Sequence, residues 1–249
     1  MPYTRALVSA IRFDHIAIAV ARMADAVDVL VGALGGAPAY GAAVGAYRFG
    51  QWRFAGGARI EILEPQGADS FLHRFLAQRG PGVHHVTFIV PSLRAACDRA
   101  EQHGYTIVGY DDSNPHWKEA FLHPREALGI VVQMAEAARG GSTPRMTLPA
   151  GPLDPPPPVR ILGLRLRARS HERARVQWES VLEGSPVGST DGRLIYRWPG
   201  SPLRLVVEID PSQDEGPVCV EFAAERKVVL PPGRHPILGA VLSEVPGSA

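Results

Sequence analysis

Short apolar alternations, each followed by a helical pattern, recur along the chain. The segments His15–Val20 and His85–Val90 both open with histidine and continue as the mostly apolar runs HIAIAV and HVTFIV, which are typical of buried β-strands. Apolar residues at helical spacing follow each segment, and each helical pattern ends at a glycine, Gly35 or Gly104. These glycines lie 20 and 19 residues after their histidines. We therefore predict one structural unit that occurs twice.

Further strand-like segments follow each predicted helix. In the first unit they lie near 47–54 and 58–63, and in the second near 105–110, 119–122 and 129–134. Each unit is thus predicted to have the order β-α-β-β-β. The fold class expected from this pattern is α+β, built from two paired βαβββ modules.

A proline-rich segment separates these modules, residues 11–136, from the rest of the chain. Four consecutive prolines, Pro155–Pro158, cannot occupy a helix and favour an extended linker, which we assign to 137–158. Beyond it the pattern returns in a weaker form, with a strand-like run, a helical run that begins after Ser170, and more strand-like runs. We predict degenerate modules of the same kind over 159–245.

Two polar residues interrupt apolar strands at matching positions of the two modules. Glu61 lies 46 residues after His15, and Gln133 lies 48 residues after His85. Each residue alone is more often exposed or hydrogen-bonded, but a buried charge is costly unless it is paired or binds metal, and the same template occurs twice. Two imidazoles, a carboxylate and an amide oxygen suit a divalent zinc, cobalt, nickel, manganese or iron ion. We therefore predict a metal site made of His15, Glu61, His85 and Gln133.

The doublet His84–His85 raises the question of which histidine faces the interior. Neighbouring residues of a regular strand point to opposite faces of a sheet. Because the alignment of the modules matches His85 with His15, we predict that His85 faces inward. His84 is expected to point outward or to support the entrance to the strand.

Composition narrows the functional classes. Hydrophobic residues make up 45% of the 249 residues and charged residues 20%, and the net charge is +1, so nothing indicates a nucleic-acid or membrane partner. The two cysteines are too few for a disulfide framework, and no apolar run is long enough for a membrane helix or a signal peptide. We expect a cytoplasmic protein with a small-molecule substrate, and leave open whether two chains form a homodimer.

Two stretches of the first half carry a family pattern. Ile60–Val90 has a strand that ends in leucine-x-proline, then a glycine-x-aspartate-serine turn, then glycine-x-histidine-histidine. Phe121–Met134 has phenylalanine-leucine-histidine-proline and a strand that begins at glycine. The sequence resembles the vicinal oxygen chelate (glyoxalase/bleomycin resistance/dioxygenase) superfamily, and most of all its methylmalonyl-CoA epimerase branch. The resemblance implies a glyoxalase-like fold in which the four polar residues above hold one metal ion.

The sequence departs from the epimerase pattern at both expected acid–base positions. The resemblance implies one glutamate in the stretch that corresponds to 41–49, and another at or beside the position of Gln133, and neither is present. Glutamine cannot take up a proton at working pH. Epimerization of methylmalonyl-CoA itself is therefore not expected.

Other polar residues are candidates for catalysis and substrate binding. A turn-rich segment of the second module contains Asp112 and His116 as candidate proton-transfer groups, and Lys118 as a candidate substrate contact. Tyr47 and Arg48 lie on a strand that is expected to face the cavity, where the arginine would hold an anionic substrate group.

Three functions are consistent with these residues. We favour a divalent-metal-dependent enzyme that acts on a small carbonyl or thioester substrate as an isomerase, epimerase or lyase, through a metal-polarised carbonyl. The alternative is a non-catalytic protein of the same fold that binds or sequesters a small molecule, which the missing glutamates favour. A further alternative is an extradiol-type dioxygenase, since two histidines and a carboxylate suit iron. In long two-domain members of that group, however, the ligands usually lie in the C-terminal half.

Overall fold

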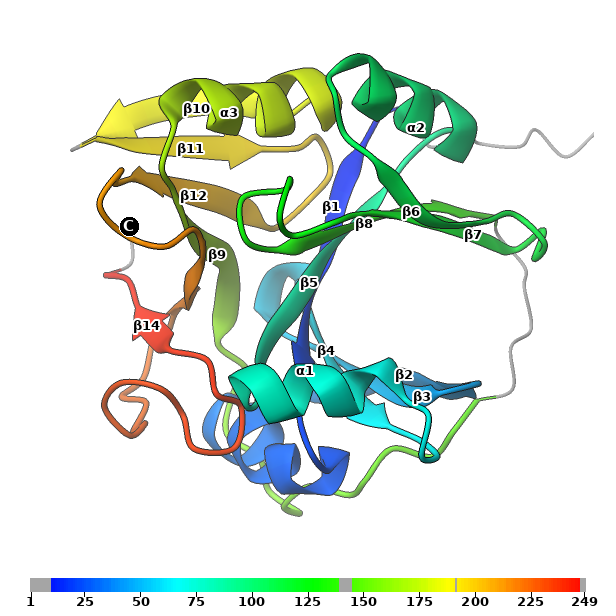
Figure 1. The fold of residues 1–249 in the computed structure, drawn as a ribbon. Coiled ribbons are helices and arrows are strands. Elements are labelled where there is room, and N and C mark those ends of the chain that lie inside the picture. The colour runs from blue at the N-terminus through cyan, green and yellow to red at the C-terminus, as the bar shows by residue number, and fades with distance from the viewer. Residues whose placement is uncertain (1–9, 139–144, 191, 247–249) are drawn as a thin grey trace, which may run out of the picture.

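Two sheets form the core of the protein, one from each half of the chain (Figure 1). The computed structural model describes residues 10–138, 145–190 and 192–246. The strands of the first sheet are β1 (Arg12–Ala19), β2 (Ala37–Val44), β3 (Tyr47–Arg53), β4 (Arg59–Pro65), β5 (Gly82–Ile89), β6 (Ile107–Asp111), β7 (Trp117–Leu122) and β8 (Val131–Ala137). Those of the second sheet are β9 (Arg160–Ala168), β10 (Ser185–Thr190), β11 (Arg193–Arg197), β12 (Arg204–Ile209), β13 (Gly216–Ala223) and β14 (Leu242–Glu244).

The first sheet has the order β2-β3-β4-β1-β5-β8-β7-β6, which confirms the duplication. The opening strands of the two modules, β1 and β5, lie antiparallel at its centre. Each has the last strand of its own module parallel to it on the other side, β4 beside β1 and β8 beside β5. The sheet curls, so that the arm β2–β4 and the arm β6–β8 face each other (Figure 1). The predicted glyoxalase-like α+β class is therefore correct.

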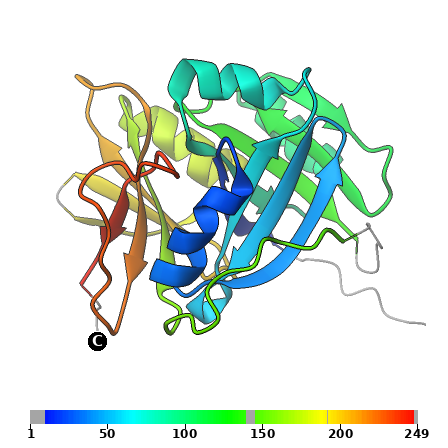
Figure 2. The ribbon, with the colours of Figure 1, turned by 90° about the horizontal axis from the view of Figure 1, so that it is seen from below.

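Helical segments cover the outer face of this sheet. In the first module, the helix predicted after β1 is a 3-10 segment, η1 (Met23–Ala26), followed by a π-helix, η2 (Asp28–Ala33), on the outer side of the sheet (Figure 2). A second short 3-10 turn, η3 (Ala55–Gly57), precedes β4. In the second module the helix is α2 (Leu93–Gln102). The Ser92 hydroxyl accepts a hydrogen bond from the Ala95 amide at 3.3 Å and so caps this helix.

One helix lies on the inner face instead. α1 (Phe71–Arg79) connects the two modules, and its Leu72 is fully buried against Ala17 and Ala19 of β1 and Leu63 of β4. The rest of α1 lies over the inner face of the sheet, next to β4 (Figure 1). The segment that connects the two modules therefore covers part of the inner face of the sheet.

The second sheet packs against the outer face of the first through aromatic side chains. Its order is β10-β11-β12-β9-β13-β14, with α3 (His171–Arg175) and η4 (Val176–Val181) on one side. Phe13 of β1 stacks on Phe88 of β5 with ring centroids 4.9 Å apart, and the Trp198 ring lies 4.8 Å from Phe88. The predicted cap of the helical run is present, because the Ser170 hydroxyl accepts from the Arg173 amide at 3.2 Å. The two halves therefore share one apolar core, and the limits proposed for the domains stay a prediction.

The proline-rich linker packs on the first module. Its described part, residues 145–158, contains no helix and no strand. The Met146 amide donates to the Gly41 carbonyl of β2 at 2.8 Å. A side chain on Gly41 would meet Leu148 at 2.5 Å, so glycine allows the linker to approach the strand this closely.

The helices of the described ranges are short. The longest, α2, has 10 residues. None has both the length and the apolar character needed to cross a membrane. The cellular location of the protein stays a prediction.

Candidate metal centre and substrate cavity

His15, Glu61 and His85 meet on the inner face of the first sheet. Ala17 of β1 pairs with Glu61 of β4 on one side and with His85 of β5 on the other, so that all three stand in one row. His15 lies two residues before Ala17 and therefore points to the same face. The ligand atoms of His15, Glu61 and His85 all lie within 4.8 Å of one another, and all three residues are buried. The small side chain of Ala17 leaves open the space that these atoms share.

Asp14 holds the His15 ring in place. The Asp14 Oδ2 atom lies 2.9 Å from His15 Nδ1, and its Oδ1 accepts from Arg12 at 2.6 Å and from Arg59 at 2.5 Å. Burial raises the pKa of Asp14, but the hydrogen bond with His15 and the neighbouring positive charges outweigh it, and the pKa falls to about 2. An ionised Asp14 accepts the Nδ1 proton and leaves Nε2 as the nitrogen that faces the group.

The two oxygens of the Glu61 carboxylate have different neighbours: one accepts a hydrogen bond from Gln51, and the other faces the two histidines. The Gln51 amide donates to Glu61 Oε2 at 2.9 Å. Glu61 Oε1 lies 3.5 Å from His15 Nε2 and 3.8 Å from His85 Nε2. Burial lowers the pKa of His15, but the negative charge of Glu61 and the hydrogen bond to Asp14 raise it to about 9. The surroundings of His15 thus attract a cation, either a proton or a metal ion.

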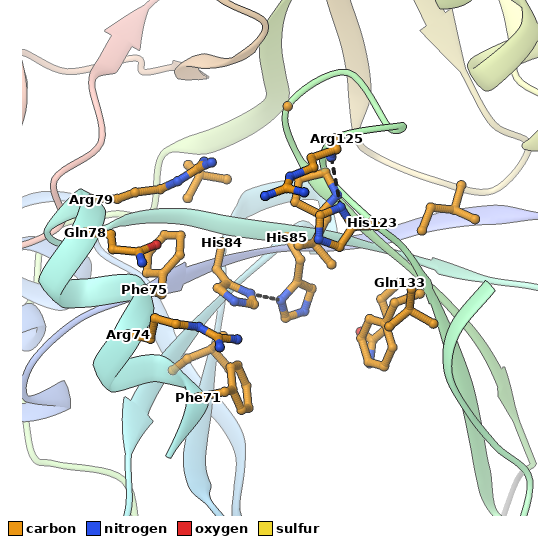
Figure 3. Close-up of a pocket in the computed structure, with 18 of the residues that line it drawn as sticks. Phe71, Arg74, Phe75, Gln78, Arg79, His84, His85, His123, Arg125 and Gln133 are labelled. Atoms are coloured by element: carbon orange, nitrogen blue, oxygen red, sulfur yellow. Dashed lines mark hydrogen bonds between the residues drawn. The ribbon is translucent and has the colours of Figure 1, made fainter. Parts of the chain in front are cut away.

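The two neighbouring histidines both face the inner side, because the strand is irregular between them. Ala17 pairs with His85 and Ile18 with Val83, which leaves His84 as the extra residue of a bulge. His84 packs against Phe71 and Phe75 of α1, with ring centroids 5.7 and 4.9 Å away. Its Nδ1 lies 3.0 Å from the Nδ1 of His85 (Figure 3). His84 is therefore turned toward α1 and the site rather than outward.

The His85 ring is neutral, and its Nε2 is the nitrogen that faces the site. Burial, followed by the neighbouring His84 and His15, lowers the pKa of His85 well below its ordinary value of 6.5. Burial likewise lowers the pKa of His84 to about 4. The Nδ1 atom of His85 is joined to His84, and its Nε2 is buried with no hydrogen-bond partner among the described residues. A buried nitrogen of this kind is costly unless a ligand satisfies it, so the three residues fit a divalent metal ion.

Gln133 lies beside this group, where its amide has protein partners. Thr87 of β5 is directly opposite Gln133 of β8, and its hydroxyl donates to Gln133 Oε1 at 2.6 Å. The Gln133 amide nitrogen donates to Glu119 Oε2 at 2.7 Å. The role of Gln133 as a fourth ligand stays a prediction.

A cavity of about 1090 Å³ opens over the site, between α1 and the arm β6–β8. Its lining includes His84, His85 and Gln133, which Figure 3 shows together with α1 residues. Tyr47 lies in the lining as the sequence indicated, and burial, followed by the charges of Glu119 and Glu61, raises its pKa, so its hydroxyl stays protonated.

Glu119 is a lining carboxylate that the sequence did not single out as functional. Trp117 Nε1 and Gln133 Nε2 both donate to its Oε2, each at 2.7 Å. Its other oxygen, Oε1, has no partner among the described residues. In the sequence, Glu119 is only a charged residue within a predicted strand. It faces the cavity because the sheet curls, and the pattern of a single strand does not predict that curl.

The remaining predicted residues lie outside the cavity lining. Asp112 and His116 are exposed, with Asp112 accepting from the Tyr110 hydroxyl at 3.2 Å. Lys118 forms an ion pair with Glu136 at 3.0 Å. Arg48 forms an ion pair with Glu64, whose second oxygen accepts from the Met23 amide at 2.8 Å. Their proposed functional roles stay predictions.

The second sheet has no comparable group among the described residues. Arg165 pairs with Cys219 there as Ala17 pairs with His85 in the first sheet, and both pairings adjoin a bulge. The Arg165 guanidinium donates to the buried Glu221 at 2.9 Å. Arg165 thus occupies the position where the first sheet has the small Ala17. Its ion pair with Glu221 lies where the first sheet has the candidate metal group.

Comparisons with known proteins match both the sequence pattern and the fold. Residues 14–121 match the model of the Glyoxalase/Bleomycin resistance protein/Dioxygenase superfamily. The uncharacterized protein YqjC of Bacillus subtilis (strain 168) is 34% identical over 128 residues, which cover 50% of this chain and 91% of that protein. An ethylmalonyl-CoA/methylmalonyl-CoA epimerase of Cereibacter sphaeroides is 32% identical over 83 residues, which cover 31% of this chain and 61% of that protein.

One solved structure resembles both halves of the chain. A mutant of 4-hydroxymandelate synthase from Streptomyces coelicolor matches with a TM-score of 0.62 and 14% identity, over 87% of this chain and 72% of that one. At this identity the match concerns the fold alone. It covers the second sheet as well as the first, as expected if the C-terminal half is built from related modules.

Proposed function

Since the chain belongs to the glyoxalase/bleomycin resistance protein/dioxygenase superfamily, we propose that it is a divalent-metal-dependent enzyme acting on a small carbonyl or thioester substrate. The reaction type is that of an isomerase, epimerase or lyase. One observation carries the proposal: the buried His85 Nε2 has no hydrogen-bond partner in the described part of the chain, and it lies within reach of Glu61 and His15 at the floor of a cavity.

The metal would be held by His15 Nε2, Glu61 Oε1 and His85 Nε2, with Gln133 as the fourth predicted ligand. A bound divalent ion would act as a Lewis acid that polarises a substrate carbonyl oxygen. With one carboxylate in the set, a doubly charged ion keeps residual positive charge for this purpose. Asp14 and His84 hold the two imidazole rings through Nδ1, so that both Nε2 atoms face the site.

A reaction of this type also needs a group that accepts a proton from the substrate. The stretch 41–49 has no carboxylate, and Gln133 cannot fill the role. Glu119 is the better candidate, because it lines the cavity beside Gln133 and its Oε1 has no partner among the described residues. The proton acceptor proposed for the second module thus lies on β7, whereas the family resemblance implies one at or beside Gln133 on β8. Epimerase relatives named for CoA thioesters favour a thioester substrate for this chain.

A binding protein of the same fold is the second candidate, favoured by the absence of a carboxylate in 41–49. Exchange of substrate hydrogen with heavy water separates the two functions. Metal-loaded protein is incubated in D₂O with a panel of acyl-CoA thioesters and α-keto acids, and proton NMR follows the hydrogen on the carbon beside the carbonyl. We expect exchange with the wild type and with a His103→Ala control, whose histidine is exposed and lies outside the cavity lining, and none with His85→Ala. Ligand binding without exchange for every compound would favour the binding protein.

A further inference from the structure

Three arginines without counter-charges line the cavity above the candidate metal group. Arg74 and Arg79 come from α1, and Arg125 comes from the loop after β7. All three are exposed, and within the described ranges their guanidinium groups form no ion pair and no hydrogen bond, the bond of Arg125 to the His123 ring being made by its backbone amide. Other arginines near the cavity differ in this respect, since Arg48 is paired with Glu64 and Arg173 with Glu215.

Among the described residues, two carboxylates line the cavity, and one of them, Glu119, lies beside Gln133 and accepts a hydrogen bond from it at 2.7 Å. The other, Glu215, accepts from the Arg169 amide at 3.0 Å and from Arg173 at 3.1 Å. In Figure 3 the guanidinium groups of Arg79 and Arg125 point toward one another from opposite sides. Like charges that face each other across a hollow repel, and an anion between them removes the repulsion.

Apolar side chains also line the cavity. Phe71 and Val108 line the cavity and are 43% and 41% exposed, which is unusual for large apolar residues in this protein. Phe75 and Phe121 extend the same wall. The cavity, at about 1090 Å³, slightly exceeds the range of roughly 300–1,000 Å³ that suits drug-sized ligands, so a small carbonyl compound alone would leave most of it empty.

We propose that Arg74, Arg79 and Arg125 bind phosphate groups at the far end of an elongated substrate. The reacting carbonyl end lies at the metal group, apolar parts of the substrate contact Phe71 and Val108, and the phosphate end lies among the arginines. A guanidinium binds the oxygens of a carboxylate or a phosphate in pairs. Phosphate groups fit better than a single carboxylate because three positive charges need more than one negative charge. This inference rests on the proposed function for the reacting end, whereas the anion site itself needs no metal.

Titration of metal-free protein with inorganic pyrophosphate tests the arginine site by calorimetry. The triple variant Arg74→Ala/Arg79→Ala/Arg125→Ala removes the proposed site. The control Arg53→Ala/Arg145→Ala/Arg197→Ala removes the same charge from three exposed arginines outside the cavity lining. We expect the wild type and the control to bind pyrophosphate with affinities within about threefold, and the site variant to bind about tenfold or more weakly.

Two results would overturn the inference: no pyrophosphate binding by the wild type, or equal weakening in the two triple variants. The second result would mean that only net charge matters. Cobalt binding, measured on the same three proteins, keeps the two proposals apart. A protein that binds pyrophosphate through the arginines but takes up no cobalt would refute the metal-dependent function and leave the anion site standing.

Discussion

Asp14 offers a quantitative test of how the metal group is supported. Its side chain is 5% exposed and lies against His15, Arg12 and Arg59 at distances between 2.5 and 2.9 Å. The change Asp14→Asn keeps the shape of the side chain but removes its charge. We expect this change to destabilise the metal-free protein and to do so in a pH-dependent way.

The magnitude follows from the lowered pKa of Asp14. The pKa falls from 3.8 to about 2 on folding, which corresponds to about 2 kcal/mol. A carboxylate whose pKa is lowered on folding stabilises the native state above its unfolded pKa. This contribution is complete at pH 7 and is lost as the pH falls from about 4 to about 2. We therefore expect Asp14→Asn to lower the free energy of unfolding by about 2 kcal/mol at pH 7 and by little near pH 2.

Urea unfolding of metal-free protein between pH 7 and pH 2.5 measures this difference. Asp25→Asn is the matched control, because Asp25 pairs with Arg22 at the surface, where the two side chains are 37% and 70% exposed. Exposed pairs contribute about 0–1 kcal/mol, so the control should change stability by less than about 0.5 kcal/mol. The reasoning is refuted if Asp14→Asn costs no more than Asp25→Asn at pH 7, or if its cost is unchanged between pH 4 and pH 2.5.

Three further predictions concern the site and its cavity. His84→Phe keeps an aromatic ring against Phe75 but removes the partner of His85 Nδ1, so cobalt affinity should fall by about tenfold; unchanged affinity in calorimetry would argue against this support. Glu119→Gln should abolish hydrogen exchange on the substrate while cobalt still binds with one ion per chain, and exchange at the wild-type rate would exclude Glu119 as the proton acceptor. Arg48→Ala should leave KM within about twofold, because Arg48 already pairs with Glu64, and a KM raised about tenfold would restore it as a substrate contact.

The duplicated fold could be predicted because its signal is periodic. His15 and His85 open matching strands, and the spacing to Glu61 and Gln133 is nearly equal in the two modules. Alternation along each strand then determines which residues share the inner face, and the pairing of Ala17 with both Glu61 and His85 brings the group together. These are properties of regular strands, which a sequence pattern reports well.

The features that the sequence did not reveal depend on irregular backbone and on curvature. The bulge at His84 turns a residue inward that strict alternation would turn outward, and no residue type in the doublet signals it. Glu119 lines the cavity because the sheet curls, and Arg125 joins α1 there although it is distant in sequence. The predicted roles of His116 and Arg48 rest on residue type and on the expected position of their segments, which do not report the pairing or exposure of a side chain, and these roles stay predictions.

The most direct test of the central claim is the number of metal ions bound per chain. Metal-free wild type, His85→Ala and the control His116→Ala are titrated with cobalt, and uptake is followed by visible absorption and by elemental analysis after gel filtration. We expect one ion per chain, at similar affinity, for the wild type and for His116→Ala, and a loss of at least about a hundredfold in affinity for His85→Ala. Absence of cobalt from the wild type, or equal binding by His85→Ala, would contradict a metal site at His15, Glu61 and His85.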